Sequence, residues 1–276
     1  MKKIYFALAA LAVFAACNKE VPTSSVQGPA EVVFKIENSL DFAVQTRAAA
    51  VTSLTTFNVV AEDSDSQSEV WSVATTQSGS NYNTGKYWPS VDGKYAFYAA
   101  NTTLAYVAGG ATVSPADNEL DVVVAYSPYS SANYKNTVAL TFEHIYARIG
   151  DVTINAPEGY SIAVSSISTA ISKGGTYNLQ SAGWTSKSAE AAQVLAEGAN
   201  DVYAVPATYD VTVVYTLTKG DFVQEFTKTG SVTLVQGKVN SISATPVVSS
   251  DEEAQDIVFT VTLTPWGSQN HDISLN

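Results

Sequence analysis

The chain has 276 residues, a net charge of −12 and only 14 lysine and arginine residues, which form no basic cluster. That balance excludes nucleic acid as an expected partner, because neutralising phosphates requires clustered Lys and Arg. The single cysteine excludes an intrachain disulfide framework and a thiolate zinc site. A hydrophobic fraction of 46% indicates packed cores, and the length suits two domains.

Residues 1–17 predict a signal peptide. Lys2 and Lys3 precede an apolar run over residues 4–14, which is too short for a membrane helix. Ala15 and Ala16 then stand before Cys17, as in a lipobox. We therefore expect lipidation of Cys17, which would anchor the precursor at a membrane. The alternative is a cysteine that ends an ordinary signal peptide by chance.

Residues 18–47 predict a tether followed by a strand. Residues 18–30 are rich in Pro, Ser, Thr, Gly and Gln and show no periodicity. Val32, Phe34 and Ile36 then alternate with their neighbours, which is the pattern of a strand with one buried face. Arg47, followed by three alanines that begin with Ala48, is typical of an exposed basic cleavage site.

Between residues 48 and 155 the pattern predicts strands near 54–60, 82–101, 121–126 and 138–154. Asp63, Asp65 and Gln67 match the start of a calcium loop, but the turn glycine and the bidentate glutamate of that loop are missing. A solvated loop is therefore the favoured interpretation. The aromatic residues around Trp88 favour a core over a carbohydrate platform. For His144 we expect a packed, hydrogen-bonded side chain.

A junction between two domains is predicted at residues 155–159, where a Pro and a Gly interrupt the pattern. Beyond it, short strands alternate with turns, and the Ala-rich residues 186–197 predict one helix. Short, turn-punctuated strands in both halves predict an all-β fold of two antiparallel sandwiches.

The C-terminus carries the clearest alternation in the chain. Apolar residues occupy every second position at Ile257, Phe259, Val261 and Leu263, and Pro265-Trp266 ends the run. A polar tail follows, in which Ile273 and Leu275 alternate again. The chain therefore begins and ends with segments capable of forming strands.

Motifs for catalysis are missing from the sequence. There is no Gly-x-Ser-x-Gly elbow, phosphate-binding glycine loop, His-Glu-x-x-His helix or dinucleotide fingerprint, and Cys17 belongs to the leader. We therefore expect neither an enzyme nor a bound cofactor.

Taken together, these features resemble the fimbrillin family of Bacteroides-type bacteria, the subunits of type V pili. The resemblance covers nearly the whole chain and rests on the lipobox at Cys17, the Arg47 junction, Tyr87-Trp88-Pro89 before Tyr95-Ala96-Phe97-Tyr98-Ala99, the segment from Phe142-Glu143-His144 to Ala147-Arg148-Ile149, and the closing Val261-x-Leu263-x-Pro265-Trp266.

The resemblance implies two transthyretin-like β-sandwich domains in tandem, over residues 48–155 and 156–276, the first completed by residues 31–47 in the precursor. It implies an outer-membrane lipoprotein that an arginine-specific extracellular protease cuts after Arg47, leaving Ala48 as the mature N-terminus. The strand carrying Val32, Phe34 and Ile36 would leave, and a strand from another subunit would replace it. The product would be an extracellular fimbrium that supports adhesion to a host surface ligand.

Three alternatives remain open from the sequence. The donated strand is either residues 257–263 or the tail 267–276, which carries Ile273 and Leu275. The subunit is either a stalk subunit or, because the chain is short, a minor or tip subunit. A function of a different class is a monomeric surface lipoprotein that binds glycan or host protein through aromatic loops at Tyr87 and Trp88.

Overall fold

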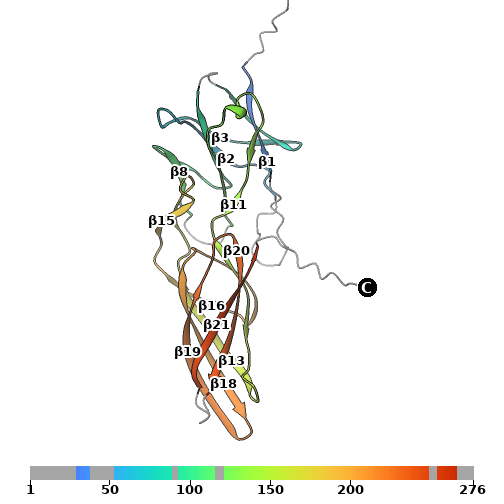
Figure 1. Ribbon diagram of the computed structural model, residues 1–276, viewed down its shortest axis with the longest axis vertical. Coiled ribbons are helices and arrows are strands. Elements are labelled where there is room, and N and C mark those ends of the chain that lie inside the picture. Colours follow the sequence, from blue (N-terminus) through green and yellow to red (C-terminus); the bar gives the residue numbers. More distant parts are fainter. Residues whose placement is uncertain (1–28, 38–52, 89–92, 116–120, 249–253, 266–276) are drawn as a thin grey trace, which may run out of the picture.

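The computed structural model describes residues 29–37, 53–88, 93–115, 121–248 and 254–265. Within these ranges the chain is all-β, with one short 3-10 helix, Ser131–Asn133, and five sheets. The predicted all-β class is confirmed. Figure 1 shows an elongated molecule with the N-terminal lobe at the top and the C-terminal lobe at the bottom. No helix among the described residues is long and apolar enough to cross a membrane.

The N-terminal lobe is a sandwich of two sheets. Sheet A has the order β10 (Val138–Leu140), β1 (Glu31–Ile36), β5 (Asn81–Tyr87) and β4 (Thr76–Ser78). Sheet B has the order β11 (Glu143–His144), β9 (Val123–Ser127), β6 (Tyr95–Ala100), β2 (Asn58–Asp63) and β3 (Ser68–Ala74). Their facing side chains form one apolar core, in which Phe34, Phe57 and Phe97 are almost completely buried.

Strand β6 is buried on both faces, which explains its uninterrupted apolar sequence. Tyr95, Phe97 and Ala99 pack into the core shared with sheet A, as their spacing predicts. Ala96, Tyr98 and Ala100 face a second core on the opposite side of sheet B. That side is covered by sheet C, with the order β15 (Gly183–Lys187), β14 (Gly175–Asn178), β8 (Gly110–Val113) and β7 (Ala105–Val107).

Sheet C joins the two halves of the chain. Strand β8 pairs with β14, with Val113 opposite Tyr177, although their residues lie far apart in the sequence. The core beneath sheet C also contains Tyr146 and Tyr203, and the indole N–H of Trp184 donates to the Ile145 carbonyl over 3.0 Å. The two lobes therefore share a packed aromatic layer in addition to the chain that connects them.

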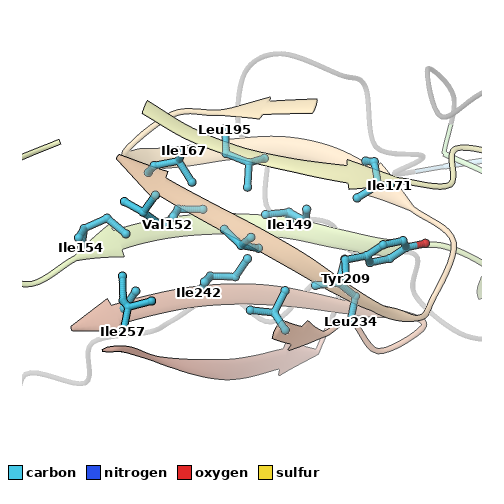
Figure 2. Close-up of a cluster of buried hydrophobic side chains, with 14 of the residues drawn as sticks. Ile149, Val152, Ile154, Ile167, Ile171, Leu195, Tyr209, Leu234, Ile242 and Ile257 are labelled. Atoms are coloured by element: carbon cyan, nitrogen blue, oxygen red, sulfur yellow. The ribbon is translucent and has the colours of Figure 1, made fainter. Parts of the chain in front are cut away.

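The C-terminal lobe is a second sandwich. Sheet D has the order β17 (Gly198–Ala204), β12 (Ala147–Ile154), β20 (Lys238–Val248) and β21 (Ala254–Pro265). Sheet E has the order β16 (Ala191–Leu195), β13 (Ser161–Ile171), β18 (Thr208–Lys219) and β19 (Phe222–Thr233). Figure 2 shows the aliphatic core between them, including Ile149, Ile167, Ile242 and Ile257.

The chain passes from the N-terminal lobe to the C-terminal lobe just before β12. That strand pairs with β17 and, in parallel, with β20, and its side chains Ile149 and Val152 lie in the C-terminal core. The junction predicted at residues 155–159 is instead a turn between two strands of the C-terminal lobe. The Pro and Gly there mark a turn, but a turn does not reveal which sheet its strands join.

The helix predicted over residues 186–197 is wrong. Strand β16 occupies Ala191–Leu195 and pairs with β13, with Ala191 opposite Ile171 and Leu195 opposite Ile167. Leu195 is buried in the C-terminal core, whereas Val194 is 73% exposed. Alanine favours a helix in isolation, but pairing with β13 and burial of Leu195 override that weak preference.

Buried tyrosines in the shared aromatic layer predict a loss of stability at high pH. Burial raises the pKa of Tyr98, and Glu62 beside it raises it further. Burial likewise raises the pKa of Tyr203 above the ordinary value of 10.0. A neutral group with a raised folded-state pKa stabilises the fold fully below pH 10.0 and loses that contribution as the pH rises toward the folded pKa.

We expect the free energy of unfolding, measured by urea titration, to fall between about pH 8 and about pH 11. Tyr98→Phe should reduce this fall, because one buried phenol no longer ionises on unfolding. Equal urea midpoints at both pH values for the unmodified chain would contradict the prediction.

Candidate functional site

Strand β1 lies inside sheet A, with a hydrogen-bonded neighbour on each edge. It runs parallel to β10, with Phe34 opposite Val138, and antiparallel to β5, with Val33 opposite Asn83. At its ends, Trp88 N–H donates to the Ala30 carbonyl over 3.0 Å, and Glu37 N–H donates to the Leu140 carbonyl over 3.0 Å. A strand is predicted from the sequence at β10, but its parallel pairing with β1 is not signalled by any local pattern.

The side chains of β1 fill the centre of the N-terminal core. Val32 is 1% exposed and Phe34 is 0% exposed, while Ile36 is partly buried, so the predicted alternation is confirmed. The Phe34 ring packs edge-on against Phe97, with 5.2 Å between centroids, and against Phe57, with 6.1 Å. Burying such side chains contributes roughly 1.5–3 kcal/mol each.

The carboxylate of Glu31 makes a specific polar contact with β5. Its Oε1 accepts hydrogen bonds from Thr84 N–H over 3.1 Å and from Gly85 N–H over 2.8 Å. The Thr84 hydroxyl in turn donates to the Val32 carbonyl over 2.7 Å. Gly85 has φ +63°, in the left-handed region that favours glycine, and lies in a bulge where the register of β5 shifts against β1.

This contact is the part of the site that the sequence did not reveal. A glycine in the sequence is typical of a break between strands, but Gly85 is a bulge inside the single strand β5. Without β1, the N–H groups of Thr84 and Gly85 would lose their acceptor, and the facing edges of β5 and β10 would lose their partner. An apolar slot lined by Phe57 and Phe97 would also open, and all three changes are unfavourable in water.

The predicted C-terminal alternation forms β21, the edge strand of sheet D. Among the described strands it pairs only with β20, with Ile242 opposite Val261. Ile257 is 4% exposed, Phe259 and Val261 are partly buried, and Leu263 is 46% exposed, so burial fades toward the end of the strand. Phe259 lies against Gly230 of β19, where a Cβ atom would meet its ring.

A comparison with known protein families assigns this chain to one of them. The model of the family described as "Fimbrillin-like" matches residues 42–266. The chain belongs to the fimbrillin-like family. No curated protein sequence matches it.

Solved structures resemble this fimbrillin-like chain over most of its length. A putative cell adhesion protein from Bacteroides eggerthii has a TM-score of 0.52 at 13% identity, covering 86% of this chain and 96% of that one. One from Parabacteroides distasonis has a TM-score of 0.51 at 11% identity, covering 87% and 97%. A fimbrilin from Porphyromonas gingivalis has a TM-score of 0.49 at 11% identity, covering 86% and 98%. At these identities the first two likenesses show a shared fold.

Several predicted site residues of the fimbrillin-like chain lie outside the described ranges. They are the lipidation residue Cys17, the cleavage pair Arg47 and Ala48, and the tail residues Ile273 and Leu275. Val32, Phe34 and Ile36 lie in β1, whereas Ile257 to Leu263 lie in β21 of the other lobe.

The aromatic residues that suggested a ligand platform belong mainly to the core. Trp88 is 7% exposed and packs edge-on against Phe97, with 5.8 Å between ring centroids. Its neighbour Tyr87 is 53% exposed. The core interpretation of Trp88 is confirmed, and a glycan-binding platform at this position would lack its indole.

The other polar candidates are structural. His144 is buried, and its Nδ1 lies 2.8 Å from Asp121 Oδ1, which confirms the expected hydrogen-bonded packing. In the acidic loop, Asp63 Oδ1 accepts from the N–H groups of Asp65 and Ser66, and hydrogen bonding to Ser66 N–H lowers the pKa of Asp63. Asp65 pairs with Lys94 over 2.8 Å. No cluster of three metal-ligating side chains occurs among the described residues.

Replacing Glu31 tests the polar contact that holds β1. Glu31→Ala should lower the free energy of unfolding of the full-length chain by about 1–3 kcal/mol, because two N–H groups lose a charged acceptor. Urea denaturation measures this change. The matched control is Glu37→Ala, since Glu37 on the same segment is half exposed and its carboxylate forms a surface ion pair with the equally exposed Lys35. That change should cost less than about 0.5 kcal/mol, and equal losses in both variants would contradict a specific role for Glu31.

Proposed function

We propose that the chain is a structural pilus subunit that is cut after Arg47 and polymerises by donor-strand exchange. The observation that carries the proposal is the position of β1 in sheet A. Arg47 lies in the sequence between β1 and β2, so a cut there would leave β1 attached to the N-terminal lobe by non-covalent contacts alone. The loss of β1 would then expose a slot that another extended segment can fill.

A strand from a second subunit would restore what β1 provides. It would pair with β5 and β10 through main-chain hydrogen bonds and place alternate side chains in the slot now filled by Val32 and Phe34. Each subunit would accept one strand and give one strand. Such a head-to-tail contact does not close on itself, so it propagates into a fibre.

The remaining parts of the proposal follow the family. The leader would export the precursor, lipid on Cys17 would hold it at the outer membrane, and an arginine-specific extracellular protease would make Ala48 the new N-terminus. The two lobes would be tandem transthyretin-like domains, and the fimbrium would support adhesion to a host surface ligand. The space between β5 and β10 that β1 now fills is called the groove of sheet A. A minor or tip subunit would use the same groove. The role is structural and involves no catalysis or cofactor.

The proposal is tested by limited trypsin treatment of the purified full-length chain. We expect N-terminal sequencing to give Ala48 and gel electrophoresis without boiling to show a ladder of oligomers. The control is Arg47→Ala, which removes the cut while leaving every described residue of the groove unchanged, and which should stay monomeric. Cleaved protein that keeps β1 bound, or that loses β1 and remains monomeric, would contradict strand exchange.

A further inference from the structure

Strands β1 and β21 carry nearly the same sequence. The two segments are Glu31-Val32-Val33-Phe34-Lys35-Ile36 and Asp256-Ile257-Val258-Phe259-Thr260-Val261. Two of the six positions are identical, and three more exchange one acid or one branched aliphatic residue for another. An acid followed by two Val or Ile residues and a Phe occurs at these two places only in the chain.

The first, second and fourth of the matching positions make the specific contacts of β1 in the groove of sheet A. The acid, Glu31, caps the two N–H groups of the β5 bulge. The second position, Val32, is 1% exposed, and the fourth, Phe34, is 0% exposed between the rings of Phe57 and Phe97. The only position without a chemical match is Lys35, whose ammonium forms an exposed pair with Glu37.

The same residue pattern is less well accommodated in β21. That strand has one hydrogen-bonded neighbour, β20, whereas β1 has two. Phe259 is only partly buried and Val258 is 54% exposed, whereas Phe34 is completely buried and Val33 partly buried. Asp256 is exposed, and its Oδ1 accepts from the N–H of its neighbour Ile257 over 2.8 Å.

Because β21 is an edge strand, it can leave sheet D without dividing it. In the groove of sheet A, residues 256–261 would have two hydrogen-bonded neighbours and a complete aromatic slot, in exchange for the pairing of β21 with β20. The tail offers a poorer match, since Asp272-Ile273-Ser274-Leu275 has a leucine at the phenylalanine position and a serine before it.

We propose that residues 256–261 of one subunit occupy the β1 groove of another in the register of β1, with the Asp256 carboxylate capping Thr84 and Gly85. Asp256 is then the residue that sets the register of the donated strand, and Val258 lies opposite Asn83. This inference rests on the proposed function, which supplies the loss of β1 and the exchange of strands between subunits. It adds the donor segment, its register and the residue that fixes the register.

The fit of this sequence to the groove can be measured without polymerisation. The substitutions Glu31→Asp, Val32→Ile, Lys35→Thr and Ile36→Val together turn β1 into a copy of residues 256–261 in the full-length chain. We expect its melting temperature to stay within about 4 °C of the unmodified chain. A copy of the tail residues 272–275, made by Glu31→Asp, Val32→Ile, Val33→Ser and Phe34→Leu, should melt well below it. The inference is overturned if the β21 copy is as unstable as the tail copy.

Cross-linking then tests the register in the polymer. In a Cys17→Ser background, Asn83→Cys with Val258→Cys should give a disulfide-linked ladder after trypsin treatment and no ladder before it. Asn83→Cys with Thr262→Cys is the matched control, because Thr262 lies on the same exposed side of β21 but four residues away, and it should give no ladder. A ladder formed by Asn83→Cys with Ser274→Cys instead would overturn the inference and leave the proposed function standing.

The role of the acid is tested by the rate of polymerisation. Asp256→Ala should polymerise about tenfold or more slowly than the unmodified chain, because two N–H groups stay without a charged acceptor. Asp256→Glu should restore the rate, since the groove accepts Glu31 in the precursor. Asp221→Asn, in the exposed turn between β18 and β19, is the charge control. An unchanged rate for Asp256→Ala would overturn the register role, whereas no polymer from the unmodified chain would count against the proposed function itself.

Discussion

The two-sided pairing of β1 in sheet A is the interaction on which the N-terminal lobe depends. One short strand provides the ladder partner of β5 and of β10, the central phenylalanine of the core and the acceptor for a bulge. These contributions act together, since the backbone hydrogen bonds place Phe34 between Phe57 and Phe97 and place the Glu31 carboxylate over Gly85. A segment that replaces β1 must therefore meet a main-chain, an apolar and a polar requirement at once.

The rest of the molecule keeps that groove in shape. Sheet B has a core on each face, one shared with sheet A and one with sheet C, so β6 cannot shift without disturbing both. Half of sheet C comes from the C-terminal part of the chain, through the pairing of β14 with β8. The two lobes are thus joined by buried aromatic packing as well as by the chain that connects them.

Strands β1 and β21 have similar sequences but lie in different environments. Phe34 and Phe259 follow the same local pattern, yet one lies at the centre of a three-ring contact and the other covers Gly230 at a sheet edge. Local alternation specifies which face of a strand is apolar. It does not specify how many neighbours the strand has, because those neighbours come from distant parts of the chain.

The sequence alone determined the all-β class and the strands β1 and β21 with their buried faces, because these follow from local periodicity. It also determined the packing of Trp88 and His144, because large aromatic side chains favour a core and a buried polar group needs a hydrogen-bond partner. Only the tertiary structure decided the parallel neighbour β10, the Glu31 contact with the Gly85 bulge, the sheet shared by both lobes and the strand that replaced a predicted helix at Ala191–Leu195. Each depends on pairing between residues that are distant in sequence, and that pairing overrides weak local preference.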